Sequence, residues 1–562
     1  MRHWWEDAVF YQIYPRSFMD SDGDGIGDLR GIESRLDHIV SLGADALWIS
    51  PVFPSPMKDF GYDVSDYRGI DPMFGNLEDF ASLIAAAKRR GIRVALDLVA
   101  NHSSDEHPWF VEARSSRSNP RHPWYLWVED TGRPPNNWKA IFELGSAWHR
   151  NEATGERYLG TFTRHQPEFD WRNPEVRRAF YDIMRYWYGL GVDGFRLDVA
   201  TAYIKDERLR SNPFSPRLVP DLLQRHLYDR NRPEVHEIFR DMRKAADAAG
   251  ERVLIGETHG QDHELAASCH GGANDELHMA FNFDFLNQPW SAEAFRVSAE
   301  RWYAALPEGA WPNFTLSNHD QNRHAWRYRG RTEEETEARA KLAAAMLLTL
   351  KGTPFLYYGE EIGMTCVRIP RRRLRDPLGI RTWPFWRNGR DQERTPMQWD
   401  ASPGAGFSSG EPWLPLNPDW RSRNVAAQEG EPASLLSWYR ALGRLRKAEE
   451  PLSRGSIEFL DLRRGVLAYD RRIAGGSGAG AAAGAAADAA AADVAAADVA
   501  AADAAPAATV RVLLNFSSRS IEAPTNAGGR VLLGTHRSEG ETIQAGPVIL
   551  GPCEALLYSL SR

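Results

Sequence analysis

The sequence predicts an α/β protein built on a (β/α)8 barrel, with one inserted domain and an all-β domain at the C-terminal end. The first observation is a unit of amphipathic helix, glycine and short apolar strand that recurs along residues 10–358. The second is a single long interruption of this repeat, and the third is a change to alternating strands after residue 450. Helices alternating with buried strands indicate a parallel sheet, and eight strands fit a closed barrel better than an open sheet.

The helices of the repeat carry their own start and stop signals. Apolar side chains keep helical spacing over residues 29–40, and Gly43 ends that helix. Asn76 can cap the next helix, whose last turn (residues 88–90) is basic and is followed by Gly91. Basic residues suit the negative end of the helix dipole, and glycine suits the position after a helix. The expected strands cover residues 10–14, 44–49, 94–99, 192–197, 253–255, 280–283, 314–316 and 354–358.

The repeat is interrupted between the strand that ends near Ala100 and the strand that begins near Val192. The gap is about ninety residues, and a crossover connection needs far fewer. We therefore expect a small inserted domain, domain B, over residues 102–170, on the loop after the third strand. The catalytic barrel, domain A, then takes residues 1–101 and 171–450.

Residues 451–562 are predicted to form a C-terminal β-domain, which follows a helix near residues 434–447. Apolar and polar side chains alternate there in short runs, as in strands with one buried face. The runs are 456–460, 466–469, 510–516, 531–533 and 555–558. A low-complexity tract of alanine and glycine, residues 475–508, carries an aspartate at every fifth position, which does not return to one helix face. We interpret the tract as a solvated insertion without a site.

The composition is that of a globular protein and excludes several classes. The chain has 68 basic and 76 acidic residues, a net charge of −8, which argues against a nucleic-acid or polybasic membrane-surface protein. It contains no apolar run of about eighteen residues, and its start lacks the apolar run of a signal peptide. The three cysteines give neither a disulfide framework nor a zinc pattern. We expect a cytoplasmic protein, a monomer or weak oligomer, that binds neither nucleic acid nor membrane.

Polar side chains gather where the predicted barrel strands end, which is where (β/α)8 barrels carry their catalytic residues. They are Asp97, Asn101, His102, Arg196, Asp198, Glu257, His319 and Asp320. Any one of them could be an ordinary loop residue or a salt bridge at the barrel mouth. Their convergence from four strands favours a single catalytic site.

The segments that carry these residues resemble the four motif regions of the α-amylase family of glycoside hydrolases (family 13). They are residues 97–102 (DLVANH), 194–198 (GFRLD), 256–258 (GET) and 317–320 (SNHD). Their order and spacing match, and so do the barrel, the inserted B domain and the C-terminal β-domain. Residues 166–171 (QPEFDW) resemble the QPDLNW motif of the oligo-1,6-glucosidase subfamily, with three departures, at positions 168–170. Residues 59–63 (DFGYD) and 394–399 (RTPMQW) resemble hallmarks of its exo-acting members.

The resemblance implies a retaining glycosidase in which Asp198 is the nucleophile and Glu257 is the general acid/base. Asp320 would be the third carboxylate, which holds the 2- and 3-hydroxyls of the sugar. Retention requires a carboxylate nucleophile and a protonated carboxyl about 5 Å apart. Arg196 precedes Asp198 by two residues on one strand, so it shares a face with Asp198 and can keep this carboxylate ionised. A crowded, partly dry site favours a protonated Glu257.

The same resemblance implies a set of substrate-binding residues. His102 and His319 would donate hydrogen bonds to hydroxyls in the −1 subsite, and Tyr62 would supply a stacking face. Asp59 with Arg394 would grip the non-reducing glucose and close the far end of the site, which implies exo action. The complete set is Asp59, Tyr62, His102, Phe162, Gln166, Arg196, Val199, His319 and Arg394.

Residues 20–28 (DSDGDGIGD) place aspartates at alternate positions among glycines, as in the first half of an EF-hand loop. The bidentate glutamate at the twelfth position is missing, because that position is Gly31. A plain acidic turn is the alternative, but its repulsion would be costly without a cation. Subfamily members carry a calcium loop at this point, so we expect structural calcium and no organic cofactor. The expected ligands are Asp20, Asp22, Asp24, the carbonyl of Ile26, and Asp28.

The resemblance implies an exo-acting α-glucosidase that releases glucose from the non-reducing end of short α-glucosides. In this subfamily a valine at the position of Val199 goes with α-1,6 links, and threonine or alanine goes with α-1,4 links. Three alternatives stay open: an α-1,4-glucosidase, a glucosyl-transferring enzyme such as a sucrose isomerase or trehalose synthase, and a non-catalytic relative. The non-catalytic transporter heavy chains carry a membrane segment and can lack the carboxylates that are present here.

Overall fold

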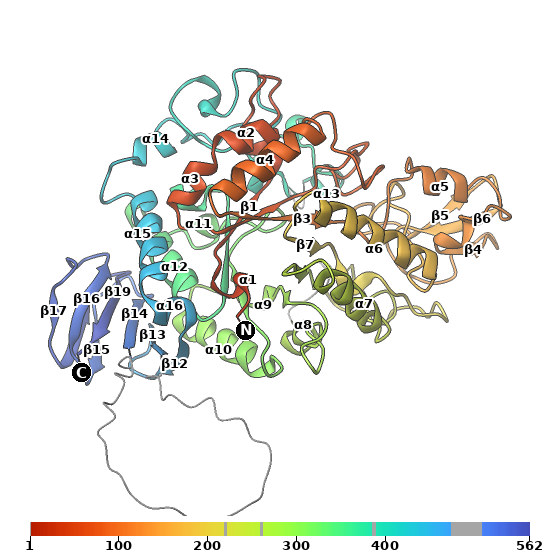
Figure 1. The fold of residues 1–562 in the computed structure, drawn as a ribbon. Helices are drawn as coiled ribbons and strands as arrows, with labels where there is room; N and C mark the ends of the chain where they lie inside the picture. The colour runs from red at the N-terminus through yellow and green to blue at the C-terminus, as the bar shows by residue number, and fades with distance from the viewer. Residues whose placement is uncertain (1, 218–221, 259–261, 385–388, 474–507, 562) are drawn as a thin grey trace, which may run out of the picture.

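The computed structural model describes residues 2–217, 222–258, 262–384, 389–473 and 508–561. Its largest sheet has eight parallel strands in the order β10-β11-β1-β2-β3-β7-β8-β9, which form a nearly closed barrel (Figure 1). The strands are β1 (Phe10–Ile13), β2 (Ala46–Ile49), β3 (Arg93–Leu98), β7 (Gly194–Leu197), β8 (Val253–Gly256), β9 (Met279–Ala280), β10 (Asn313–Thr315) and β11 (Thr353–Tyr357). The predicted fold class is confirmed.

Helices alternate with these strands along the chain and cover the outside of the barrel (Figure 1). The described helices are α1 (Trp4–Asp7), α2 (Leu29–Ser34), α3 (Leu36–Ser41), α4 (Leu77–Arg89), α5 (Pro108–Ala113), α6 (Pro174–Gly189), α7 (Val235–Asp247), α8 (His263–Ser268), α9 (Phe283–Leu286), α10 (Ala292–Ala305), α11 (His324–Arg327), α12 (Glu333–Thr349), α13 (Pro377–Thr382), α14 (Val425–Gln428), α15 (Leu435–Ala448) and α16 (Glu450–Arg454). In this part of the chain, no helix combines the length and the apolar character needed to cross a bilayer.

Helix α4 shows how the sequence sets the ends of an element. The Asn76 side chain accepts hydrogen bonds from the backbone N–H groups of Glu78 and Asp79, and Asp79 completes a capping box. Gly91 follows the helix with a φ of +74°, a backbone conformation that a β-carbon disfavours. The chain then enters β3, which carries Asp97 toward the carboxyl end of the barrel.

Two expected elements differ in detail from the structure. The helix expected over residues 29–40 is divided into α2 and α3, because the backbone leaves helical values at Arg35, whose guanidinium packs over the ring of Trp399. The strand expected over residues 280–283 is the short β9, because Asn282 caps helix α9 directly after it. Neither difference moves a residue of the predicted catalytic rim.

The segment expected as domain B contains an antiparallel sheet of β4 (Trp127–Glu129), β6 (Glu156–Leu159) and β5 (Trp148–Asn151), in that order, and it extends from one side of the barrel (Figure 1). An isolated antiparallel bridge between His102 and Glu168 joins the end of this segment to the chain after β3. Glu168 Oε2 also lies 2.6 Å from Lys205 Nζ, and both side chains are at most 2% exposed. Breaking a buried ion pair is costly, so this contact fixes the segment on the barrel.

The C-terminal region is all-β and antiparallel. A six-stranded sheet has the order β12-β13-β14-β19-β16-β17, and β15 pairs with β18. The strands are β12 (Ser456–Leu460), β13 (Val466–Ile473), β14 (Ala508–Asn515), β15 (Ile521–Thr525), β16 (Gly529–Gly534), β17 (Thr542–Ile543), β18 (Gly546–Leu550) and β19 (Ala555–Leu560). The Ala/Gly-rich tract lies outside the described residues, apart from Ala508, which pairs with Ile473. The domain boundaries themselves stay a prediction.

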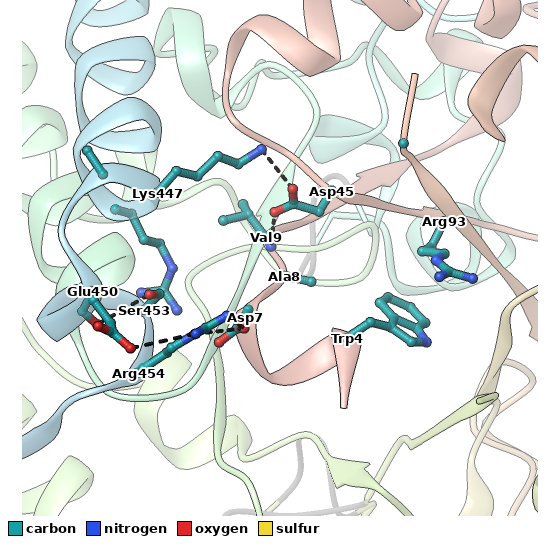
Figure 2. A pocket seen from close by; sticks show the side chains of 13 residues that line it. Trp4, Asp7, Ala8, Val9, Asp45, Arg93, Lys447, Glu450, Ser453 and Arg454 are labelled. Atoms are coloured by element: carbon teal, nitrogen blue, oxygen red, sulfur yellow. Dashed lines mark hydrogen bonds and ion pairs between the residues drawn. The ribbon is translucent and has the colours of Figure 1, made fainter. Parts of the chain in front are cut away.

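A cavity of about 570 Å³ lies at the amino ends of β1, β2 and β3, against the ends of α15 and α16 (Figure 2). Two ion pairs span it: Lys447 lies 2.7 Å from Asp45, and Arg454 lies 2.9 Å from Asp7. They tie Asp7, near the start of the chain, and Asp45, just before β2, to the helices that lead into the C-terminal region. In (β/α)8 barrels this end serves stability, and catalytic residues lie at the opposite end.

Candidate active site

The carboxyl ends of β3, β7, β8 and β10 bring four carboxyl groups to one end of the barrel. Asp97 is on β3 itself, and Asp198 and Glu257 directly follow β7 and β8. Asp320 lies in the turn after β10. The sheet register places Asp97 opposite Arg196 on the neighbouring strand. The structure therefore brings together the side chains that the sequence singled out at the strand ends.

Arg196 is the cation that these carboxyl groups share. Its Nη1 lies 2.7 Å from Asp97 Oδ1 and 2.6 Å from Asp198 Oδ1. Its Nη2 lies 2.6 Å from Glu257 Oε2. The Arg196 side chain is 2% exposed, whereas those of Asp198 and Glu257 are 8% and 15% exposed. The guanidinium thus holds the two carboxyl groups from the inside and leaves them accessible to a ligand.

The pKa values of Asp198 and Glu257 are both raised by burial. For Glu257, desolvation is the largest cause, Asp320 adds to it, and Arg196 acts in the opposite direction. For Asp198, desolvation again dominates and outweighs the attraction of Arg196. From the sequence we expected Arg196 to lower the pKa of Asp198. Burial more than offsets this effect of Arg196. Two buried carboxyl groups of raised pKa beside one guanidinium readily keep a proton between them, which suits acid–base chemistry.

Asp320 lies in a different electrostatic environment. Arg394 Nη2 lies 2.6 Å from its Oδ1, and His319 Nε2 lies 3.0 Å from its Oδ2. Desolvation acts to raise the pKa of this carboxyl, but His319, Arg390 and Arg394 outweigh it and hold the pKa well below its ordinary value. The Asp320 side chain is 28% exposed, so an ionised carboxylate is available to accept hydrogen bonds from hydroxyl groups.

His319 and Tyr62 form a hydrogen-bonded pair next to Asp97. Their rings are parallel to within 1° with centroids 5.4 Å apart. The Tyr62 hydroxyl lies 3.0 Å from Asp97 Oδ2 and 2.6 Å from His319 Nε2. The amide of Gln12 donates to His319 Nδ1 at 2.8 Å, which places the imidazole proton on Nε2. The hydroxyl oxygen of Tyr62 and Nε2 of His319 each lie in the plane of their own ring, so their 2.6 Å contact means that the two parallel rings lie edge to edge. His319 therefore does not cover a face of Tyr62, and the expected stacking of a sugar on Tyr62 stays a prediction.

Arg390, and not Arg394, is the ion-pair partner of Asp59. Arg390 Nη2 lies 2.5 Å from Asp59 Oδ1, and its Nη1 lies 3.4 Å from Asp320 Oδ1. Arg394 is fully buried and donates instead to the carbonyl oxygen of His319 at 2.8 Å. The two arginines stand one turn apart around a 3-10 helix over Asp391–Glu393, so only the first of them reaches Asp59. The structure therefore gives Asp59 an ion-pair partner other than Arg394, and the expected grip of Asp59 and Arg394 on the terminal glucose stays a prediction.

The inserted segment supplies Gln166 and Phe162 to this side of the site. The Gln166 amide donates to Asp59 Oδ2 at 3.1 Å and to the Tyr62 carbonyl oxygen at 3.2 Å. His102 Nε2 lies 2.9 Å from the same carbonyl oxygen, and burial lowers the pKa of His102 to about 4, so its ring is neutral. The ring of Phe162 lies 5.1 Å from that of His102. These residues form one connected group around Asp59.

Val199 follows the predicted nucleophile and forms an apolar wall beside it. Its side chain is 5% exposed and belongs to a small cluster with Phe142, Phe162, Ala202 and Leu378. This apolar surface next to the two carboxyl groups can contact a ligand through its shape, but its side chains cannot form a hydrogen bond with the ligand.

The acidic loop after β1 brings three of its aspartates together. Asp20, Asp22 and Asp28 each place a carboxylate oxygen within 4.8 Å of the other two. The Asp20 carboxylate also accepts three backbone N–H bonds of the same loop, so the loop is wound around it. Asp24 is outside this group of three and accepts the Ile26 N–H at 2.7 Å. Several converging carboxylate oxygens fit a hard cation such as calcium.

The sequence reasoning missed Arg390, Gln12 and Phe142. Gln12 is a polar residue in an apolar, fully buried strand, and this inconsistency is a signal that could have revealed it. Arg390 stands four residues before Arg394, in a segment without helical or strand periodicity. The ring of Phe142 lies 4.3 Å below the Arg390 guanidinium, and nothing in its local sequence separates it from a core residue.

A (β/α)8 barrel in which two accessible carboxyl groups share a guanidinium, beside a third that is ionised, is the arrangement of a glycoside hydrolase. The chain belongs to the α-amylase family of these enzymes, family 13. The family model for the alpha amylase catalytic domain matches residues 12–455.

The chain is similar over most of its length to proteins named as glucosidases. It is 45% identical over 485 residues to a probable alpha-glucosidase of Rhizobium meliloti, which covers 84% of this chain and 87% of the relative. It is 39% identical over 489 residues to an oligo-1,6-glucosidase of Parageobacillus thermoglucosidasius, covering 82% and 86%. Among solved structures, an alpha-glucosyl transfer enzyme superimposes with a TM-score of 0.88 at 36% identity, with both chains covered completely.

Proposed function

We propose that the protein is an exo-acting, retaining α-glucosidase that releases glucose from short α-glucosides and prefers α-1,6 links. Asp198 attacks the anomeric carbon while Glu257 gives its proton to the departing oxygen, and a glucosyl-enzyme is formed. Glu257, now ionised, then takes a proton from water, and the oxygen of that water displaces Asp198. Asp320 holds the 2- and 3-hydroxyls and, as a fixed anion, stabilises the positive charge of the transition state.

The contact that carries the exo proposal is the buried ion pair between Asp59 and Arg390. It adjoins Asp320, because Arg390 also lies 3.4 Å from that carboxylate, and Gln166 extends it by a hydrogen bond to Asp59. A charged pair in this place can hold the outer hydroxyls of one terminal glucose and leaves no passage for a longer chain. The expected products are therefore single glucose units.

The preference for α-1,6 links is proposed from Val199 and from the names of several relatives. In this proposal the two methyl groups of Val199 stand beside the leaving sugar. They crowd the ring of an α-1,4-linked sugar, whereas the extra methylene of a 1,6 link turns the ring away from them. We expect isomaltose to exceed maltose in kcat/KM, and Val199→Thr to narrow the difference by about tenfold or less, since one methyl group discriminates weakly. Initial rates on both disaccharides measure this. Faster hydrolysis of maltose by the unchanged enzyme would favour an α-1,4-glucosidase.

Transfer of glucose to a sugar is the second candidate, because solved structures of similar fold include an alpha-glucosyl transfer enzyme and a trehalulose synthase from Pseudomonas mesoacidophila. The two activities share the glucosyl-enzyme and differ in whether water or a sugar attacks it. Product analysis on isomaltose, maltose and sucrose separates them: free glucose supports hydrolysis, and new disaccharides support transfer.

We propose that the loop with Asp20, Asp22 and Asp28 holds a structural calcium ion, with Asp24 and the carbonyl of Ile26 as further ligands. Calcium that binds only the folded chain stabilises it, by about 2.7 kcal/mol at a concentration one hundred times Kd. Chelation is therefore expected to lower the melting temperature, and added calcium should restore it.

The matched variants for this test are Asp22→Asn in the loop and Asp461→Asn, whose side chain is 96% exposed elsewhere. Only the loop variant should lose the response to calcium. A melting curve that stays the same in protein shown by metal analysis to be calcium-free would identify the loop as a plain acidic turn.

We also propose a cytoplasmic setting and a monomeric or weakly associating chain. All three cysteines are free and buried, and a reducing compartment suits such a set. Size-exclusion chromatography coupled to light scattering measures the association state.

A further inference from the structure

Val199 has a backbone conformation that its side chain disfavours. Its φ of 40° and ψ of 41° lie in the left-handed helical region, where a branched β-carbon crowds the backbone. Residues in such conformations persist only where the surrounding structure imposes them, and they gather at functional sites. The position of Val199, between the nucleophile Asp198 and a 3-10 turn over Ala200–Ala202, is such a site.

Residues from outside the barrel share a buried apolar cluster with Val199. Phe142 and Phe162 belong to the inserted segment and Leu378 to α13, and all three are members of the same buried apolar cluster as Val199. The Val199 carbonyl oxygen accepts the Ala202 N–H at 2.8 Å, which closes the turn from the other side. The side chain and the carbonyl group of Val199 are therefore both fixed.

The left-handed conformation directs the Val199 N–H at the acid/base. Glu257 N donates to Leu197 O at 3.0 Å, the last main-chain contact between the ends of β7 and β8. The Val199 N–H then donates to the side chain of Glu257, at 2.8 Å from Oε2. Arg196 contacts the same oxygen. Among the described residues both contacts fall on Oε2, so Oε1 is the oxygen left to carry the proton.

We propose that Val199 is a positioning residue for Glu257. Packing against Phe142 and Phe162 holds its backbone in the left-handed conformation, and this conformation fixes the N–H on Oε2 so that Oε1 faces the leaving oxygen. The role is separate from the choice of linkage by side-chain size, and it rests on the proposed acid/base role of Glu257. Through it, the inserted segment contributes to catalysis without supplying the proton.

A hydrogen bond to a carboxylate favours its ionised form, so losing the Val199 N–H raises the pKa of Glu257. The rate requires protonated Glu257 in the first step, and the alkaline limb of the kcat/KM profile must then move to higher pH. The other charged and titratable groups that act on Glu257 are Arg196, Asp198, Tyr203, His319 and Asp320. All of them are unchanged in the test below, so the shift reports on the N–H.

The test replaces the residue 199 amide by an ester. The hydroxy-acid analogue of valine, delivered by a suppressor tRNA in cell-free translation, removes the N–H and keeps the side chain. We expect the alkaline limb to move up by about one pH unit. Protein made with valine on the same tRNA is the control. A limb that does not move would overturn the proposal.

Two side-chain variants test the packing. Val199→Thr keeps the branched β-carbon and the N–H, so its alkaline limb should match that of the unchanged enzyme. Val199→Ala loses the methyl groups that Val199 contributes to the cluster with Phe142 and Phe162, and its alkaline limb should move in the same direction as in the ester, by less. An unmoved limb in Val199→Ala contradicts the role of packing. Normal activity in Glu257→Gln would refute the acid/base role of Glu257. An inactive Glu257→Gln enzyme together with an unmoved alkaline limb in the ester would refute only the positioning role of Val199.

Discussion

Replacing Asp198 by asparagine, or Glu257 by glutamine, is expected to lower kcat for isomaltose by at least about a thousandfold while the fold is retained. Asparagine cannot form the glucosyl-enzyme, and glutamine can neither protonate the leaving oxygen nor activate water. Because burial raises the pKa of Glu257, the unchanged enzyme should stay active above the ordinary pKa of a glutamate and lose activity as the pH rises through the raised value.

The matched controls are Asp37→Asn and Glu237→Gln, whose carboxylates are 80% and 64% exposed on the outer helices. Their kcat values should stay near that of the unchanged enzyme, and circular dichroism and melting curves check the fold of all four variants. Near-normal turnover in Asp198→Asn or Glu257→Gln would refute the assignment of that residue.

Azide separates the two roles by the stereochemistry of the product. In Asp198→Ala, azide can attack an aryl α-glucoside from the side that the nucleophile has vacated, so the β-glucosyl azide is expected. In Glu257→Ala, the glucosyl-enzyme still forms from a substrate with a good leaving group, and azide then attacks it from the opposite face to give the α-azide. Nuclear magnetic resonance distinguishes the anomers. The α-azide from Asp198→Ala and the β-azide from Glu257→Ala would mean that the two residues have each other's roles.

The barrel and its rim could be predicted because each depends on a local pattern. Helix ends are marked by caps such as Asn76 and by glycines such as Gly91. Once the strands are located, the first residues after them are known to meet at one end of the barrel. Asp198 and Glu257 follow their strands immediately, so their convergence needed no knowledge of tertiary contacts.

The contacts made by loops could not be predicted in the same way. Arg390 and Arg394 are alike in chemistry and one turn apart, and only the path of that turn over the site decides which one meets Asp59. Val199 is a residue type that favours strands, yet its backbone is in the left-handed region and its side chain lies in one buried cluster with Phe142 and Phe162 of the inserted segment. In both cases a segment distant in sequence sets the outcome, and periodicity contains no information about such a contact.

Replacing Arg390 by alanine is expected to lower kcat/KM for short α-glucosides by about a hundredfold or more. The change leaves Asp59, which is 4% exposed on its side chain, as a buried carboxylate without its cation, and removing one partner of a buried pair costs about 3–5 kcal/mol. Part of this cost falls on the complex with substrate, because Arg390 also lies 3.4 Å from Asp320, which holds the sugar hydroxyls. Initial rates on isomaltose and isomaltotriose measure the loss.

The exposed pair of Arg30 and Asp79 supplies the matched control, since the Arg30 side chain is 70% exposed and such pairs contribute little. Arg30→Ala should therefore leave kcat/KM unchanged. If Arg390 and Asp59 act as one unit, the double variant Arg390→Ala with Asp59→Ala should show a fold-decrease in kcat/KM much smaller than the product of the two fold-decreases in the single variants. Removal of the pair also opens the far end of the site, so the double variant should release longer sugars besides glucose from isomalto-oligosaccharides. If the losses of kcat/KM are fully additive and the double variant still releases only glucose, another group closes this end of the site.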